Sequence, residues 1–167
     1  MEQLTEKKAL DELVIKKIED RGVSMKQIGE LTYFLQEKYY TTLTVDDCVD
    51  NVMAVLKKRE VQNAILTGIQ LDELAERGLL DEPLQGMVSK DYSLYGVDEI
   101  LAFSIVNVYG SIGFTNFGYI DKVKPGILRD LDIKDDTANV CHTFLDDLIG
   151  AVAAAAASRI AHSKEFE

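Results

Sequence analysis

The sequence predicts an all-α fold, a single-domain helical bundle in which a C-terminal helix of small residues is surrounded by the other helices. Apolar residues recur every three to four positions along most of the 167 residues, which is the spacing of one helix face. Residues 150–158 are almost all Gly, Ala or Ser, and side chains of this size let neighbouring helices approach closely. With 47% apolar residues and two prolines, the chain has enough apolar sequence for one compact core.

Capping residues and glycines mark the expected helix ends. Ser24 and Thr44 are suitable N-caps, and Gly22 and Gly68 follow apolar periodic stretches. The expected helices cover about residues 6–21, 25–40, 45–67 with a continuation through 71–78, 83–90, 97–110, 113–123 and 140–162. They group into an N-terminal hairpin (1–43), a middle region (44–95) and a C-terminal region (96–163). Residues 97–110 are so apolar that a strand is the alternative interpretation, but a buried helix agrees better with their length.

The charge of the chain excludes some classes of partner. Lys and Arg number 18 against 29 Asp and Glu, which gives a formal net charge of −11 and argues against nucleic acid as a partner. No stretch reaches the ~18–20 apolar residues that a membrane-spanning helix needs. We therefore expect a cytoplasmic protein with at most peripheral membrane contact, and self-association through the apolar faces of its N-terminal helical half. Cys48 and Cys141 are expected to be reduced core thiols.

Acidic residues occur at three places beside the apolar sequence of the C-terminal region. They lie in VDEIL (97–101), YIDKVKP (119–125) and LDDLIGA (145–151). If these places converge at one end of the bundle, buried carboxylates need a cation, and oxygen ligands favour Mg²⁺ or Mn²⁺. A nearby lysine is the usual complement to a phosphate. The alternative is that the acidic pairs are ordinary helix N-terminal residues, which the helix dipole favours by ~0.3–1 kcal/mol.

Taken in order, these three motifs resemble the phosphatidylglycerophosphatase A family. That family carries an Asp-Glu, an Asp-x-x-Lys-Pro and an Asp-Asp followed by small residues, in the same order and at comparable separations. The resemblance implies a magnesium-dependent phosphatase, with Mg²⁺ or Mn²⁺ as cofactor, that hydrolyses the terminal phosphate of phosphatidylglycerophosphate. Because family members are typically hydrophobic membrane proteins and this chain is not, a more soluble phosphomonoester is the other substrate that we expect.

The resemblance also implies roles for individual residues. The implied catalytic residues are Asp98, Glu99, Asp121, Lys124 and Asp147, and the implied metal ligands are Asp98, Glu99, Asp121, Asp146 and Asp147. The chain has Gly118 where the family usually has an Arg. His142 lies one helical turn before Asp146 and is either a further ligand or proton carrier, or a core histidine. A function of a different class is a non-enzymatic helical binding or regulatory module with a structural or vestigial cation site.

Overall fold

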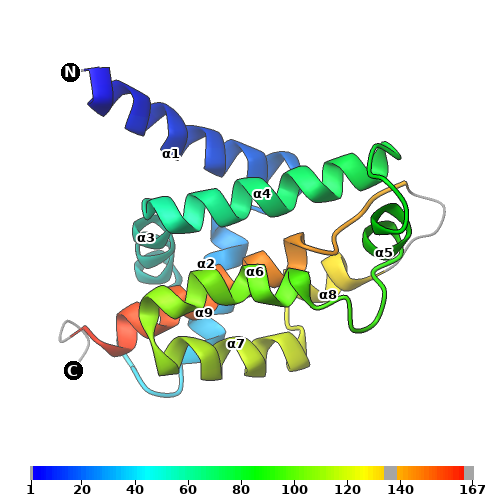
Figure 1. The fold of residues 1–167 in the computed structure, drawn as a ribbon. Helices are drawn as coiled ribbons and strands as arrows, with labels where there is room; N and C mark the ends of the chain where they lie inside the picture. The colour runs from blue at the N-terminus through cyan, green and yellow to red at the C-terminus, as the bar shows by residue number, and fades with distance from the viewer. Residues whose placement is uncertain (1, 134–138, 164–167) are drawn as a thin grey trace.

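The computed structural model describes residues 2–133 and 139–163, and within these ranges the chain forms helices and turns without strands. The predicted all-α class is therefore confirmed. Figure 1 shows the helices in order: α1 (Glu2–Asp20), α2 (Met25–Gln36), α3 (Val45–Leu56), α4 (Arg59–Glu76), α5 (Leu84–Ser89), α6 (Val97–Val106), a 3-10 turn η1 (Asn107–Tyr109), α7 (Ser111–Val123), α8 (Ile127–Asp132) and α9 (Leu145–Ala161).

The C-terminal helix α9 is the centre of the bundle, as the small residues predict. It packs against α2, α3, α4, α6, α7 and α8. All of its residues are buried except Asp146, Arg159 and Ala161. Small side chains make this possible, and Gly68 of α4 shows how tight the packing is, because a Cβ atom there would lie 2.5 Å from Leu148 Cδ1. Neither α9 nor any other described helix is long and apolar enough to cross a membrane.

The predicted caps of α2 and α3 are present. Ser24 and Thr44 each accept a hydrogen bond from the backbone N–H three residues later, and the side chains of Gln27 and Asp47 bond back to the cap residues. These capping boxes satisfy N–H groups that a helix start otherwise leaves unpaired. They fix where both helices begin, so local sequence determines the two boundaries.

Several predicted boundaries differ from the structure. The helix expected over 25–40 ends at Gln36, and Gly68, expected to end a helix, lies inside α4. The helix expected over 45–67 is divided at Lys57 and Lys58, where α3 ends and α4 begins. The side-chain amide of Gln62 donates to the carbonyl of Leu56 at 2.8 Å, so a side chain from the first turn of α4 satisfies a carbonyl at the end of α3. The last helix begins at Leu145 instead of residue 140, and the helix expected over 97–110 changes to a 3-10 turn at Asn107.

The two cysteines are free and buried, as predicted. Burial raises the pKa of Cys48 to about 12 and that of Cys141 to about 11. Both thiols are therefore protonated at neutral pH and act as small apolar groups in the core.

Candidate functional site

Three helix ends meet where the sequence places its acidic motifs. Asp98 lies in the first turn of α6, Asp121 in the last turn of α7, and Asp146 and Asp147 in the first turn of α9. Both α6 and α7 pack along α9, so the start of α6 and the end of α7 are brought to the start of α9. We call Asp98, Asp121, Asp146 and Asp147 the acidic cluster.

The Lys124 ammonium group lies among three of these carboxylates. Its Nζ atom is 2.7 Å from Asp121 Oδ1, 2.7 Å from Asp146 Oδ2 and 4.0 Å from Asp147 Oδ1. Lys124 is the C-cap of α7 and has a left-handed backbone with a φ of 46°, which an L-residue adopts only where its surroundings hold it. Burial acts to lower the pKa of Lys124, but Asp146 and Asp121 overcome it and the net pKa is raised. The ammonium therefore stays charged.

The two carboxyl groups of α9 are electrostatically unfavourable as anions. Burial raises the pKa of Asp146, and the charge of Lys124 only partly offsets this effect. Burial also raises the pKa of Asp147, and the negative charges of Asp146, Asp121 and Asp98 raise it further. One lysine is too little positive charge for this group of carboxylates, so the acidic cluster would gain stability from a bound cation.

The buried carboxylate of Asp98 is also incompletely neutralised by its surroundings. Its side chain is only 9% exposed, and its Oδ1 atom is buried without a hydrogen-bond partner among the described residues. Burial raises the pKa of Asp98, and the charges of Asp91 and Asp121 add to the increase, whereas the N–H groups of Asp98 and Glu99 oppose it. A buried oxygen without a partner costs ~1–3 kcal/mol, which a ligand could recover.

Glu99 is not brought into the acidic cluster. Its side chain is exposed, although it follows Asp98 directly. Consecutive helix residues point about 100° apart, because a turn contains ~3.6 residues, so only one member of the Asp-Glu pair faces α9. The structure thus gives Asp98 and Glu99 different surroundings.

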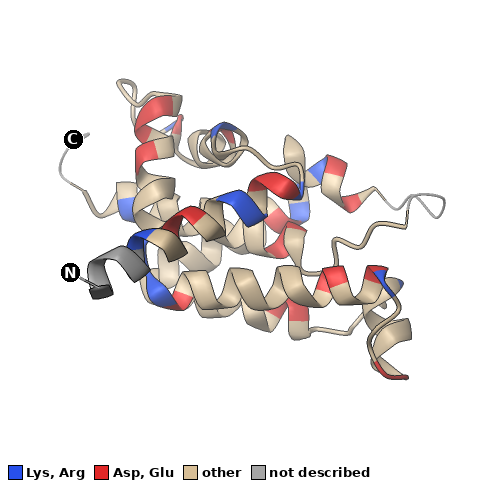
Figure 2. Cartoon of the chain, turned by 90° about the horizontal axis from the view of Figure 1, so that it is seen from above, with Lys and Arg blue, Asp and Glu red and all other residues tan. Residues whose placement is uncertain are grey.

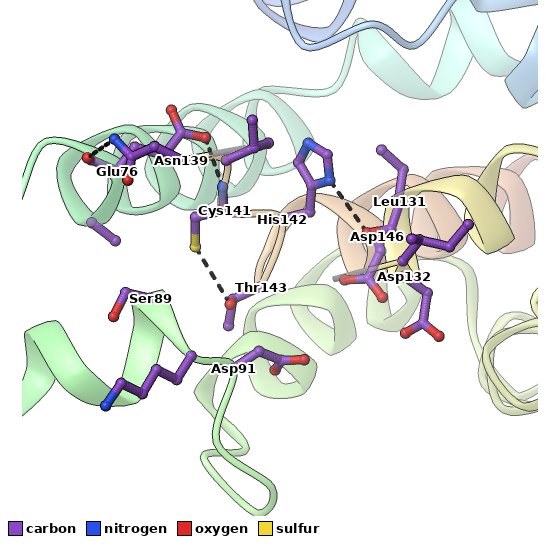
Figure 3. A pocket seen from close by; sticks show the side chains of 14 residues that line it. Glu76, Ser89, Asp91, Leu131, Asp132, Asn139, Cys141, His142, Thr143 and Asp146 are labelled. Carbon is purple, nitrogen blue, oxygen red and sulfur yellow. Dashed lines mark hydrogen bonds between the residues drawn. The ribbon is translucent and has the colours of Figure 1, made fainter. Parts of the chain in front are cut away.

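A pocket with a volume of about 590 Å³ lies next to the acidic cluster, and Asp146 forms part of its wall. Figure 3 shows the carboxylates of Asp91, Asp132 and Asp146 around this pocket, on segments that follow α5, end α8 and start α9. His142 also lines it, and its Nδ1 atom is 3.2 Å from the carbonyl oxygen of Leu131. Burial lowers the pKa of His142, which favours the neutral ring. His142 is therefore a residue of the pocket wall.

Asp91 is a residue that sequence reasoning missed. It lies in the connection before α6, with a left-handed φ of 46°, and its charge raises the pKa of both Asp98 and Asp146. In the sequence Asp91 reads as one acidic residue in the polar turn DYSLYG, and only the tertiary fold places it near the acidic cluster.

The donor set of the acidic cluster fits a hard divalent cation in chemistry, though the described side chains do not form a ready-made site. No group of three or more His, Cys, Asp or Glu side chains in residues 2–133 and 139–163 is spaced to hold a metal as it stands. The Lys124 ammonium lies between the carboxylates instead. The donors of the acidic cluster are all carboxylate oxygens, the ligand type that hard divalent cations take, and the buried Asp98 Oδ1 atom has no hydrogen-bond partner among the described residues.

Residues 15–162 match the family model of phosphatidylglycerophosphatase A. The Bacillus subtilis (strain 168) proteins YutG and YpjQ, both described as uncharacterized, are similar to this chain. YutG is 64% identical over 146 residues, which is 87% of each chain. YpjQ is 56% identical over 145 residues, which is 87% of this chain and 80% of its own.

Solved structures are similar over almost the whole chain. A protein of unknown function from Bacillus stearothermophilus has a TM-score of 0.87 at 62% identity, over 91% of this chain and 93% of its own. The low temperature requirement C protein from Listeria monocytogenes has a TM-score of 0.88 at 61% identity, over 92% of this chain and 96% of its own. The helical arrangement described above is thus common to these proteins.

Proposed function

The chain belongs to the phosphatidylglycerophosphatase A family, and we propose that it is a magnesium- or manganese-dependent phosphatase that hydrolyses a phosphomonoester. The observation that carries this proposal is the Lys124 ammonium among Asp121, Asp146 and Asp147, beside a pocket that Asp146 also lines. An ammonium group next to oxygen ligands for a cation suits phosphoryl transfer, where negative charge must be neutralised. The substrate is a phospholipid headgroup phosphate or a more soluble ester.

The residues of the acidic cluster and Lys124 have separate roles in this proposal. Asp98, Asp121, Asp146 and Asp147 would hold the cation, which when bound polarises a phosphoryl oxygen and lowers the pKa of a water molecule. Lys124 would pair with a phosphate oxygen of the substrate. Asp147 would act as one of the cation ligands, because a bound cation would favour the deprotonated form of a carboxyl whose pKa burial and the neighbouring carboxylates raise.

A second candidate function is favoured by the ion pairs themselves. Lys124 already neutralises part of the acidic cluster at distances of 2.7 Å, which is sufficient for a structural role. The chain would then be a non-enzymatic helical binding or regulatory module with a structural or vestigial cation site. This function requires no turnover, so an activity assay separates the two.

We expect the purified protein to release inorganic phosphate from a phosphomonoester with millimolar Mg²⁺ or Mn²⁺, and not with chelator. The substrates to compare are phosphatidylglycerophosphate in detergent micelles and a soluble alkyl or aryl phosphate, and free phosphate is measured over time. Turnover of the soluble ester alone would identify the more soluble class. No release from either substrate with either cation would contradict the phosphatase proposal and favour the binding module.

We also expect Mg²⁺ or Mn²⁺ to raise the melting temperature, more strongly at high pH than at low pH. A ligand that binds only the folded state stabilises it by about 2.7 kcal/mol at a hundredfold excess over its dissociation constant. Because the folded pKa of Asp147 is raised, its contribution to stability is present at low pH and is lost as pH rises above the unfolded value of about 3.9. A cation needs the deprotonated carboxylates, so its stabilising effect increases over the same range. Thermal unfolding with cation and with chelator measures this stabilising effect.

Two neighbouring variants serve as a matched pair for this measurement. Asp98→Asn removes the buried carboxylate and should eliminate most of the cation-dependent shift. Glu99→Gln changes an exposed side chain in the same helical turn and should retain it. Equal melting temperatures with cation and with chelator in the wild-type protein would count against a cation site, whatever the activity assay shows.

A further inference from the structure

The helices α6 and α7 form an uncharged face on an otherwise acidic protein. Residues 100–120 contain no Asp, Glu, Lys or Arg, whereas the whole chain has a net charge of −11. These residues span α6, η1 and most of α7. In Figure 2, acidic and basic residues colour many of the helices, and long tan stretches lie between them.

Large apolar side chains on this face are exposed. Ile100 is 65% exposed, and we call the exposed large apolar residues Ile100, Phe103, Val108 and Phe114 the α6–α7 face. Tyr119 is also exposed, but its ring stacks on Phe34 of α2 and lies under the Lys38 ammonium, so it is not counted in this face. The rings of Phe103 and Phe114 lie 5.6 Å apart between centroids, so the apolar surface continues from α6 to α7. Single exposed apolar residues are normal, but a contiguous group on two packed helices indicates an interaction surface.

Two hydroxyl groups within this surface are already hydrogen-bonded to their own helices. Ser104 Oγ donates to the carbonyl of Leu101 at 2.6 Å, and Thr115 Oγ1 donates to that of Ser111 at 3.1 Å. Covering these two hydroxyl groups would leave neither donor unpaired, so their desolvation cost is small, although the side-chain nitrogen of Asn116 in the same stretch has no hydrogen-bond partner among the described residues. The surface is therefore suited to burial.

The distribution of charge indicates which kind of partner covers the α6–α7 face. Two copies of a protein with a net charge of −11 repel each other through most of their surface, but not where neither copy carries a charge. The exposed residues at one end of the face are Glu99 and Lys122, one of each sign, which matches the polar rim of a protein–protein interface. Docking on an anionic bilayer would instead need a basic rim.

We propose that the α6–α7 face is the interface of a homodimer. This surface differs from the one expected from the sequence, which was the N-terminal half. Among the side chains described in that half, from residue 8 onward, the exposed large apolar ones are Leu13, Tyr39 and Leu79, which lie on separate elements. The dimer does not depend on the proposed activity, but α6 and α7 also carry Asp98, Asp121 and Lys124, so pairing would hold the helix ends that bear the acidic cluster.

Sedimentation velocity and light scattering on the full chain test this proposal. The wild-type protein should have twice the monomer mass at micromolar concentration. It should keep that mass in molar NaCl, because salt screens the repulsion between the copies and leaves the uncharged contact intact. Ile100→Asp places two like charges at the interface and should weaken dimerisation by at least about 10-fold. Leu79→Asp, at a residue that is 61% exposed outside the face, should remain dimeric.

The variants must keep the helical circular dichroism and melting temperature of the monomer fold, and Ser104→Glu, at an exposed position on the face, provides a second variant. A monomeric wild-type protein throughout the concentration range would overturn the proposal. So would an Ile100→Asp protein that dimerises as tightly as wild type. Flotation with zwitterionic and anionic vesicles tests a membrane as the partner instead. The proposal would also be contradicted if the wild-type protein were a monomer that binds vesicles through this face and the Ile100→Asp variant did not bind them.

Discussion

Replacing Asp147 by Asn is expected to lower kcat for phosphomonoester hydrolysis by at least about 100-fold, because the cation that its carboxylate would help to hold stabilises the transition state by several kcal/mol. The melting temperature of the metal-free variant should stay level or rise. Asp147 is buried, and its pKa is raised by burial and by the neighbouring carboxylates, so its negative charge destabilises the metal-free fold. Asn has nearly the same shape without this charge. Steady-state phosphate release at saturating Mg²⁺, together with thermal unfolding in chelator, measures both effects.

The opposite responses of activity and stability are the decisive feature of this variant. If Asp147 only supported the fold, its substitution would lower kcat and the melting temperature together. Glu99→Gln is the matched control, because this exposed residue lies in the same site motif and should keep kcat within a few-fold of wild type. An Asp147→Asn protein with wild-type kcat would remove Asp147 from the mechanism and would leave the acidic cluster with at most a binding role.

The part of the site that sequence could predict rests on helix ends. Each motif lies beside an apolar helix, and the small residues of α9 indicate a central helix against which other helices pack. Given an all-α bundle, the starts and ends of neighbouring helices must meet at its two ends. The convergence of Asp98, Asp121 and Asp146 follows from this geometry.

The rest depends on side-chain directions and on contacts between distant residues. The sequence alone does not distinguish Asp98 from Glu99, because the start of an almost wholly apolar helix leaves open which side faces α9. The division at Lys57 and Lys58 has no glycine or proline to mark it, and it is completed by the Gln62 side chain. Asp91 has a place near the acidic cluster only because the connection before α6 turns through a left-handed residue.

Asp72 is the clearest example of a residue whose surroundings the sequence does not predict. In LDELAERG it looks like an exposed acidic residue of an amphipathic helix, yet it is fully buried. Its carboxylate accepts hydrogen bonds from the backbone N–H groups of Phe144 at 3.1 Å and Leu145 at 3.0 Å. The start of α9 has no side-chain cap from its own residues, so Asp72 of α4 supplies it. Burial raises the pKa of Asp72 to about 7, against the opposing effect of these N–H groups and Arg21.

Asp72→Ala is expected to lower the free energy of unfolding by about 1–3 kcal/mol, the cost of leaving a buried hydrogen-bond donor without its acceptor. The substitution removes the cap of the central helix and leaves the buried N–H groups of Phe144 and Leu145 without acceptors. Asp72→Asn keeps one oxygen acceptor and should lose less. Urea unfolding followed by circular dichroism measures both variants and gives a value for Asp72→Asn if Asp72→Ala does not fold.

Glu73→Ala provides the matched control, because Glu73 is the next residue of α4 and its contact is a partly exposed ion pair with Lys17 at 2.9 Å. Such a pair contributes ~0.2–1 kcal/mol, so this variant should unfold close to the wild-type midpoint. The difference between adjacent acidic residues then measures the cap itself. If Asp72→Ala unfolded at the same urea concentration as Glu73→Ala, the start of α9 would be held by packing alone, and the placement of Asp146 and Asp147 would not depend on α4.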